Sequence, residues 1–258
     1  MWQETYNSHW AVGNDILFCK GLFGGEKYYM FPQGVTPNDY GYVKNVLLED
    51  ADGQVIFEGI LEQQKQVIRN IFPSVEFVEN RDNFDYVYLR SELESFSGRK
   101  FHGQKNHLNS FLKEHPDVEY ETITRYNAKE CLDFALAWCD ERQEKDATIT
   151  NEKLALQKCF ANFEELNLRG GLLRFDGKVQ AMSVGDKFNQ NTADLHFEKA
   201  KSGVRGLYVA MCYFFAQNAW QDVVYLNREE DMGLEGLRKA KENLHPVMMI
   251  KKYTAVVK

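Results

Sequence analysis

Residues 170–215 read GGLLRFDGKVQAMSVGDKFNQNTADLHFEKAKSGVRGLYVAMCYFF. Two apolar segments in this stretch flank Asp176-Gly177, a dipeptide that is typical of a hairpin turn, so strands are predicted at 170–175 and 179–187. A third strand is predicted at 192–199. The short loop at 201–206 then leads into a helix with apolar residues on one side. The stretch therefore predicts three strands, a glycine-containing loop and a helix.

The flanking sequence extends this order on both sides. Before it, a strand is predicted at 119–124, a helix after the capping-box pattern Asn127–Glu130, and a second helix from near Asn151. After it, a strand is predicted at 223–227, a helix from Leu234 to Leu244 and a closing strand at 247–253. The complete order is β, α, α, β, β, β, α, β, α, β. Its central part is the order of the acetyltransferase-like (GNAT) acyltransferase fold.

The N-terminal half repeats the tail of this order. Strands are predicted within 10–18, 27–31, 54–57, 75–79 and 86–89, and two helical stripes are predicted around Val43 and Val67. The opening strand and the first two helices of the unit have no counterpart here. We therefore predict an α/β protein with mixed sheets and two tandem acetyltransferase-like domains, the first incomplete at its N-terminus. The predicted bounds are 1–96 for the first domain, 97–116 for a basic inter-domain helix and 117–258 for the second domain.

Composition restricts the class of protein. The chain has 258 residues, a mass of 30.0 kDa, a formal net charge of −7 and a pI near 5.5. An acidic balance argues against a dedicated nucleic-acid coat and against DNA as a partner, although a local basic groove is compatible with it. The five cysteines lack the C-x2-C spacing of a zinc site and are expected to be reduced, which indicates a cytoplasmic protein without a bound metal. No apolar run reaches the ~20 residues that a membrane-spanning helix needs.

The loop at 201–206 is a candidate phosphate-binding element. Gly203 and Gly206 would let a ligand approach the backbone, and Arg205 could pair with a phosphate. The loop does not match the usual coenzyme A loop of the superfamily, which has Arg or Gln, two residues, Gly, one residue, then Gly or Ala. An ordinary glycine turn before a helix is the alternative reading.

Two further segments carry candidate chemistry. His196 and Glu198 share one face of the predicted strand, and together they could deprotonate or hold an amine nucleophile. The alternative is that the two side chains satisfy each other structurally. The other segment, residues 227–241, reads NREEDMGLEGLRKAK and follows a strand, at the position where ligands bind in α/β sheets. Helix capping and charge pairing are its structural alternative.

Three motifs carry a resemblance to a known family. The segments GRKFHGQKNH (98–107) and HFEKA (196–200), followed by residues 227–241, resemble the bacterial family related to the C-terminal catalytic domain of phosphatidylglycerol lysyltransferase. The resemblance covers essentially the whole chain. That family is built from two acetyltransferase-like domains in tandem, as are the Fem peptidyltransferases of cell-wall synthesis.

The resemblance implies roles for particular residues of this chain. The basic segment would face the cleft and hold phosphates of a tRNA end or of another phosphate-bearing molecule, with a solvated helix face as the alternative: Arg99, Lys100, Lys105, Asn106 and His107. The remaining motif positions would bind substrate: Lys199, Arg228, Glu229, Glu230, Asp231, Arg238 and Lys239. From the chemistry of the side chains rather than from the resemblance, we infer that Glu198 with His196 would be catalytic. No cofactor would be required, and no metal site is expected.

Three functions remain open from the sequence. The first is aminoacyl transfer from an activated ester, of the aminoacyl-tRNA type, to a hydroxyl or amine acceptor. The second is coenzyme A-dependent N-acetylation of a small amine or peptide, for which acidic side chains such as Glu229 and Glu230 would attract a cationic acceptor. The third is a non-catalytic binding module that retains the cleft of the fold.

Overall fold

The computed structural model describes residues 1–51, 53–141 and 147–258, and its contacts divide the chain into two compact units. The C-terminal unit is formed by residues 86–249 together with Met1. The N-terminal unit is formed by residues 2–85 and 250–258. These contact-defined units have other bounds than the predicted domains, 1–96 and 117–258, which stay a prediction. The end of the chain belongs to the N-terminal unit, and the segment 97–116 lies within the C-terminal unit.

The C-terminal unit is built on a seven-stranded mixed sheet with the order β12-β6-β11-β10-β9-β8-β7. Its strands are β6 (Asp85–Leu89), β7 (Glu119–Thr122), β8 (Arg169–Phe175), β9 (Lys178–Asp186), β10 (Thr192–Ala200), β11 (Tyr225–Asn227) and β12 (Met248–Ile250). Its helices are α3 (Arg90–Leu93), α4 (His102–Glu114), α5 (Ala128–Glu141), α6 (Ala147–Ala161), α7 (Leu207–Asn218) and α8 (Glu235–Glu242). Strands β8, β9 and β10 are antiparallel neighbours, and β10 is parallel to β11.

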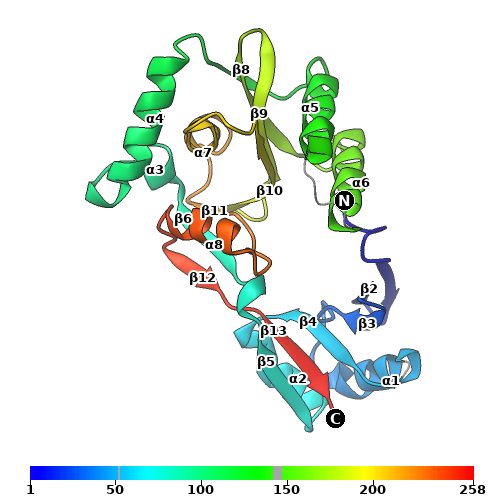
Figure 1. Cartoon of the computed structure of the whole chain (residues 1–258). Helices are drawn as coiled ribbons and strands as arrows, with labels where there is room; N and C mark the ends of the chain where they lie inside the picture. Colours follow the sequence, from blue (N-terminus) through cyan, green and yellow to red (C-terminus); the bar gives the residue numbers. More distant parts are fainter. Residues whose placement is uncertain (52, 142–146) are drawn as a thin grey trace. The chain divides into compact units, whose positions relative to one another are not determined.

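Helices cover both faces of the β8–β10 strands. Helix α7 lies against one side, and α5 and α6 lie against the other (Figure 1). The α7 side is a large apolar core whose fully buried members include Met211, Phe215 and Trp220. On the other side, Trp138 of α5 donates from Nε1 to the Ala200 carbonyl at 2.8 Å, which fixes α5 to the end of β10. The three-strand, helix order predicted from residues 170–215 is confirmed.

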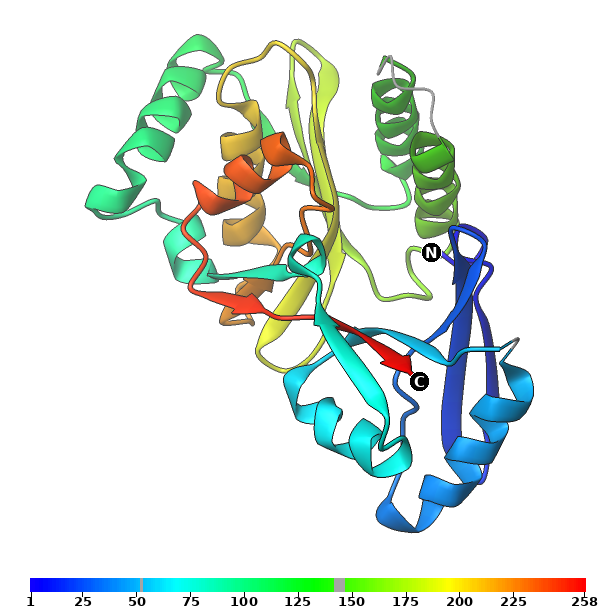
Figure 2. The same cartoon turned by 60° about the horizontal axis from the view of Figure 1, so that its bottom comes forward.

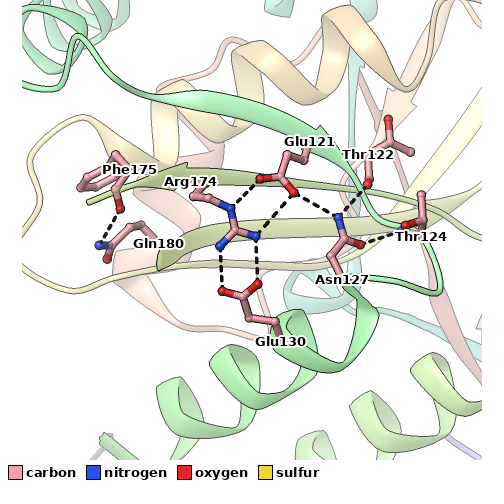
Figure 3. Close-up of polar contacts among 8 residues, drawn as sticks. All are labelled: Glu121, Thr122, Thr124, Asn127, Glu130, Arg174, Phe175 and Gln180. Carbon is pink, nitrogen blue, oxygen red and sulfur yellow. Dashed lines mark hydrogen bonds and ion pairs between the residues drawn. The ribbon is translucent and has the colours of Figure 1, made fainter. Parts of the chain in front are cut away.

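Charged side chains also tie α5 to the sheet. Arg174 of β8 donates to Glu121 of the neighbouring strand β7 and to Glu130 in the first turn of α5 (Figure 3). Asn127 reaches the same cluster through Glu121 and also accepts from the Thr124 N–H at 2.7 Å. The Arg174 guanidinium therefore links the edge strand β7 to helix α5 through bidentate, charge-assisted hydrogen bonds. This network orients α5.

Helix α4 packs on α7 within the same unit. Phe101, Leu108 and Phe111 are buried in the core that α7 also lines, as their helical spacing predicts. Gly206, just before α7, adopts φ +82°, and a Cβ atom there would lie 2.5 Å from the His107 carbonyl oxygen. A side chain at this position would collide with the α4 backbone, so the glycine permits close approach of the two helices.

The N-terminal unit has a six-stranded sheet with the order β1-β2-β3-β4-β13-β5. Its strands are β1 (His9–Gly13), β2 (Ile16–Phe23), β3 (Glu26–Tyr29), β4 (Ile56–Ile60), β5 (Val75–Glu79) and β13 (Tyr253–Val257). Helices α1 (Tyr40–Asp50) and α2 (Lys65–Ile71) lie on the same side of this sheet (Figure 2) and bury Val43, Leu47, Ile68 and Ile71 in its core. Here too an antiparallel hairpin precedes a helix and a parallel strand, because β3 pairs with β4 in parallel.

Two predicted strands lie in a different sheet from the one expected. The strand near 86–89 belongs to the C-terminal sheet, between β12 and β11. Its residues Asp85 to Tyr88 are all buried, which is the pattern of a central strand covered on both faces. The closing strand predicted at 247–253 is two strands, and β13 pairs with β4 and β5 of the N-terminal sheet. The sequence pattern predicts strand positions but not the partners of strands that are distant in sequence.

Candidate functional site

Strands β10 and β11 part shortly after they meet. They pair in parallel only from Thr192↔Tyr225 to Asp194↔Asn227, and β10 then continues to Ala200 without β11 beside it. After β11 the chain turns away through Glu229, whose φ of +57° is strained for a residue other than glycine. The carboxyl ends of two parallel strands therefore diverge here. This is the position at which open α/β sheets bind ligands.

We call the place where β10 and β11 diverge the parting of the two strands. An ion pair spans it. Arg228 donates from Nη2 to Glu198 Oε1 at 2.6 Å, and both side chains are nearly buried, with 13% and 12% exposed. Burial alone would lower the pKa of Arg228, but the Glu198 carboxylate, together with Cys212 and Tyr88, outweighs burial and raises the pKa. Among the residues that the structure describes, the other carboxylate oxygen of Glu198, Oε2, is buried and has no hydrogen-bond partner. Glu198 is thus held by Arg228 through one carboxylate oxygen, while its other oxygen is buried and makes no hydrogen bond within the described part of the chain.

The core beside this ion pair is apolar, and burial there favours the uncharged forms of the Cys212 thiol and the Tyr88 phenol. Cys212 of α7 lies 3.8 Å from Arg228 Nη1, and burial raises the pKa of its thiol to about 12. Tyr88 of β6 lies with its ring 5.9 Å from the Arg228 guanidinium carbon, and burial raises the pKa of its phenol as well. The thiol therefore remains protonated at neutral pH and is not a nucleophile.

The His196 side chain contacts two carboxylates, and neither of them is Glu198. A bulge in the β9–β10 register between Leu195 and Phe197 breaks the alternation of side chains on which the predicted pairing of His196 with Glu198 depends. The His196 ring lies 2.7 Å from Glu229 Oε1 through Nδ1 and 3.4 Å from Asp186 Oδ2 through Nε2. Burial lowers the pKa of His196, and the two carboxylates more than compensate, so the net shift is upward.

Asp194 completes this acidic cluster. It lies opposite Asp186 in the hairpin register and opposite Asn227 in the β10–β11 register. Burial, followed by the charge of Glu229, raises the pKa of Asp194 to about 6. The cluster of Asp186, Asp194, His196 and Glu229 thus places three carboxyl groups and one imidazole where β10 and β11 diverge, and the pKa values of Asp194 and His196 are both raised.

The raised Asp194 pKa predicts a specific pH dependence of stability. The folded state holds this proton more tightly than the unfolded state, so the contribution of Asp194 to the free energy of unfolding falls as pH rises from about 4 to about 6. The slope is about 1.4 kcal/mol per pH unit at most. His196 acts in the same direction at higher pH, because its folded pKa is also raised. The free energy of unfolding of Asp194→Asn, minus that of the parent protein, is therefore expected to increase as pH rises. Urea unfolding at pH 4.5, 6 and 7.5 measures this difference.

The comparison of the two proteins isolates Asp194 from other groups that titrate in this range. A stability difference between parent and variant that stays constant from pH 4.5 to 7.5 would contradict the assignment.

A buried hydrogen-bond network lies next to residues 228–230, the segment that follows β11. Asp231 is fully buried and accepts from Arg238 Nε and Nη2 at 2.8 Å each, from the Tyr86 hydroxyl at 2.5 Å and from the Gly233 N–H at 2.9 Å. Burial alone would raise the pKa of Asp231, but these donors hold it well below its usual range. Lys241 donates to the carbonyl oxygens of the three residues 228–230. Asp231 and Arg238, predicted as substrate-binding, act in the structure as supports of Arg228 and Glu229.

The other predicted substrate-binding residues are dispersed. Lys199 lies on the opposite side of the sheet, where its amine pairs with Glu152 of α6 at 2.5 Å and lies 4.0 Å from the ring centroid of Trp138. Glu230 is half-buried, and Lys239 is exposed on α8. The structure therefore turns Lys199 away from the Glu198–Arg228 pair.

The predicted basic segment and the predicted phosphate loop meet. His107 of α4 and Arg205 of the loop are in contact, with 3.3 Å between Nδ1 and Nε, at the point where Gly206 lets the helices approach. Lys100 pairs with Glu92, and Lys105 donates to the Ser95 carbonyl, while Arg99 and Asn106 are exposed. Gly203 has φ +80° in an exposed turn. We call the surface formed by Arg99, Lys100, Lys105, Asn106, His107 and Arg205 the α4 basic face.

Sequence reasoning missed several residues of the site. Asp186 and Asp194 precede the motif and could have been found from the hairpin, since strands joined by a short turn place their ends opposite each other. Tyr88 and Cys212 come from distant elements, and no local pattern marks them. Among residues 1–51, 53–141 and 147–258, no group of three or more His, Cys, Asp or Glu side chains is arranged to hold a metal ion. In the same ranges, no helix has the length and apolar character to cross a membrane.

Comparisons with known proteins find relatives of this chain. A curated relative from Mycoplasmoides gallisepticum, an uncharacterised protein, is 21% identical over 175 residues, which cover 67% of this chain and 56% of the relative. The chain thus spans little more than half of the length of that protein. Among solved structures, a conserved protein of unknown function from Bacteroides thetaiotaomicron is 37% identical, with a TM-score of 0.91 over 100% of this chain and 88% of that one.

A second solved structure shares the fold at low sequence identity. The structure of L-PGS from Bacillus licheniformis covers 98% of this chain and 89% of its own, with a TM-score of 0.70 and 15% identity. The model of the family described as phosphatidylglycerol lysyltransferase, C-terminal, matches residues 1–256. The mixed sheets, the parallel pairing of β10 with β11 and the helix α7 before the parting are those of an acetyltransferase-like, acyltransferase-type fold. The chain belongs to the phosphatidylglycerol lysyltransferase C-terminal family.

Proposed function

We propose that the protein is an acyltransferase that moves an aminoacyl group from an activated ester, of the aminoacyl-tRNA type, to a hydroxyl or amine acceptor. One observation carries the proposal: Glu198 is held by Arg228 at the parting of β10 and β11, and its second carboxylate oxygen is buried without a hydrogen-bond partner among the described residues. A carboxylate fixed in this way is suited to accept a proton from an attacking nucleophile. The family supports acyl transfer as the class of reaction.

The chemical step would use groups of this chain alone. The acceptor O–H or N–H gives its proton to Glu198 Oε2 while the acceptor atom bonds to the ester carbonyl carbon. The carbon–oxygen bond to the donor ribose then breaks, and Glu198 returns the proton to the departing oxygen. Backbone N–H groups of β10 that face the parting would stabilise the negative oxygen of the intermediate. The step as written uses neither a metal nor a cofactor.

Arg228 has a positioning role in this scheme. Its hydrogen bond fixes Glu198 Oε1, so that Oε2 alone meets the acceptor. Its carbonyl and that of Glu229 are in turn held by Lys241. We therefore assign Arg228 to the orientation of the base rather than to a phosphate of the donor.

The α4 basic face would bind the donor's phosphates. It gathers cations from α4 and from the loop before α7 on a chain with a net charge of −7. A local cluster of this kind attracts a polyanion without the whole protein being basic. Acetyltransferase-like domains bind acyl-coenzyme A through the same loop, so a coenzyme A donor is the second candidate.

A binding panel tests the donor. Charged tRNA is expected to raise the melting temperature of the protein and to bind more tightly than uncharged tRNA, because only the charged form fills the parting. Lys105→Glu with Arg205→Glu should weaken binding and reduce the slope of log K against log salt concentration by about 1 for each phosphate that the protein no longer neutralises. Lys129→Glu, an exposed lysine on α5, is the matched control and should have little effect.

Two outcomes would contradict the proposal. Stabilisation by acyl-coenzyme A with none by charged tRNA would replace the aminoacyl donor with coenzyme A. Binding of charged and uncharged tRNA with equal affinity, without transfer to any acceptor, would favour a non-catalytic binding module.

A further inference from the structure

The N-terminal unit contains a pocket that the proposed reaction does not use. It lies between helix α1 and strands β1–β3 and has a volume of about 220 Å3. For comparison, an apolar cavity of about 150 Å3 is large enough to bind benzene. The pocket is therefore large enough for a small organic molecule.

One side of the pocket is apolar and partly aromatic. Ala11 of β1 lies directly opposite Phe18 of β2 in the antiparallel register, so the two side chains share a face of the sheet. Phe18 meets Tyr42 of α1 edge to face, with ring centroids 6.2 Å apart and planes at 73°. Val46 and Leu47 continue this wall along α1. These groups suit a flat or branched apolar body.

The other end of the pocket is polar and built around Asp50. Its carboxylate accepts from Lys20 Nζ at 2.5 Å and from the Tyr29 hydroxyl at 2.8 Å, and Lys27 donates to its backbone carbonyl at 2.6 Å. Burial alone would raise the pKa of Asp50, but the bonds from Lys20 and Tyr29 outweigh it and lower the pKa. Both carboxylate oxygens therefore already have donors, and Asp50 orients the lysine amine.

Lys20 is the group that a ligand would meet. Its ammonium has three hydrogens, of which Asp50 receives one. Its side chain remains 34% exposed, and it lies opposite His9 in the β1–β2 register. The pocket thus offers a fixed cation at one end and an apolar wall along the rest.

We propose that this pocket binds a small carboxylate with an aromatic or branched apolar body. The carboxylate accepts from Lys20 Nζ, and the body lies between Ala11, Phe18 and the face of α1 that carries Tyr42 and Val46. A ligand ammonium would not bind in the same place, because the charge of Lys20 would repel it. Asp50 would not attract it either, because both oxygens of its carboxylate already accept hydrogen bonds from Lys20 and Tyr29. The site is independent of the Glu198–Arg228 pair and of the proposed reaction.

Methyl NMR of the full chain tests the proposal with 3-phenylpropionate as the probe. Saturable shifts are expected at the methyl groups of Val46 and Leu47, which line the pocket. The amide 3-phenylpropanamide, which has the same shape and no charge, should bind about tenfold more weakly, because a charge-assisted bond is replaced by a neutral one. The amine 3-phenylpropylamine should give no shifts at these methyl groups.

Variants separate the two parts of the pocket. Lys20→Met should weaken 3-phenylpropionate binding about tenfold, the size of effect expected when a charge-assisted bond is removed, and Asp50 would retain Tyr29 and Lys27 as donors. Lys44→Met, an exposed lysine of α1 that does not line the pocket, is the matched control and should bind as the parent does. Ala11→Phe, at an exposed position on the pocket side of β1, should fill the space and abolish the shifts without disturbing the core.

Three results would overturn the assignment. The first is the absence of saturable shifts at Val46 and Leu47 with millimolar 3-phenylpropionate. The second is equal binding of the carboxylate and the amide. The third is a Lys20→Met or Ala11→Phe variant, shown to be folded by its methyl spectrum, that binds 3-phenylpropionate as tightly as the parent protein.

Discussion

Replacing Glu198 by glutamine is expected to lower the rate of aminoacyl transfer by about 100-fold or more, the size of effect that removal of a general base produces. Glutamine keeps the shape of the side chain and an oxygen that can accept from Arg228 Nη2, but it cannot take a proton from the acceptor. Transfer from charged tRNA, followed under single-turnover conditions in the presence of a mixture of soluble hydroxyl and amine acceptors, measures the effect.

Controls must separate lost chemistry from lost structure, since Glu198 and Arg228 are nearly buried. Glu198→Asp keeps the carboxylate, so it should preserve the melting temperature. Because its side chain is one methylene shorter, the carboxylate lies farther from the acceptor, and the rate should still fall. Glu235→Gln makes the same chemical change at an exposed position of α8 and should leave both properties unchanged. A Glu198→Gln variant that retains the parent rate within a few-fold would exclude Glu198 as the base.

Replacing Asp231 by alanine is expected to lower the free energy of unfolding by about 3 kcal/mol, in the range measured when one partner of a buried ion pair is removed. The change leaves the Tyr86 hydroxyl and the Gly233 N–H without their acceptor and Arg238 without its carboxylate. The loss of the hydrogen bonds that these donors make to Asp231 accounts for most of the effect. Urea unfolding at pH 7 measures it.

Asp222 provides a matched comparison. It also binds an arginine through both carboxylate oxygens, Arg169 at 2.6 and 3.0 Å, but its side chain is 45% exposed. Asp222→Ala should therefore cost less than about 1 kcal/mol, as exposed ion pairs do. Similar losses for the two variants would show that the Asp231 network does not support the segment 228–230.

The sequence predicts most elements of this fold because each one satisfies a local rule. The Asp176-Gly177 turn sets the hairpin of β8 and β9, and the spacing of Leu108 and Phe111 sets the buried side of α4. The assignment of strands to sheets does not follow from local rules. Strand β13 completes the N-terminal sheet although most of the chain separates it from β4, and nothing in residues 253–257 indicates that partner.

The site is predicted in part for the same reason. Glu198 and Arg228 come from two neighbouring strand ends, which an α/β sheet brings together, so both are expected near one site. The pairing of His196 with Glu198 follows from strict alternation, and the β-bulge after Leu195 removes that alternation. Asp231 and Arg238 carry the charges expected of a binding site, yet they satisfy each other. Charge alone does not distinguish a group that binds a ligand from one that supports it.

A crystal structure with a stable donor analogue tests the central claim most directly. The analogue is an adenosine that carries an amide-linked aminoacyl group at the 3′ position, which imitates the charged end of a tRNA and cannot be transferred. The account predicts that its carbonyl lies in the parting of β10 and β11, within reach of an acceptor held by Glu198 Oε2, with the adenosine toward the α4 basic face. Binding of the analogue elsewhere, with the parting empty and the Glu198–Arg228 pair unchanged, would contradict the account.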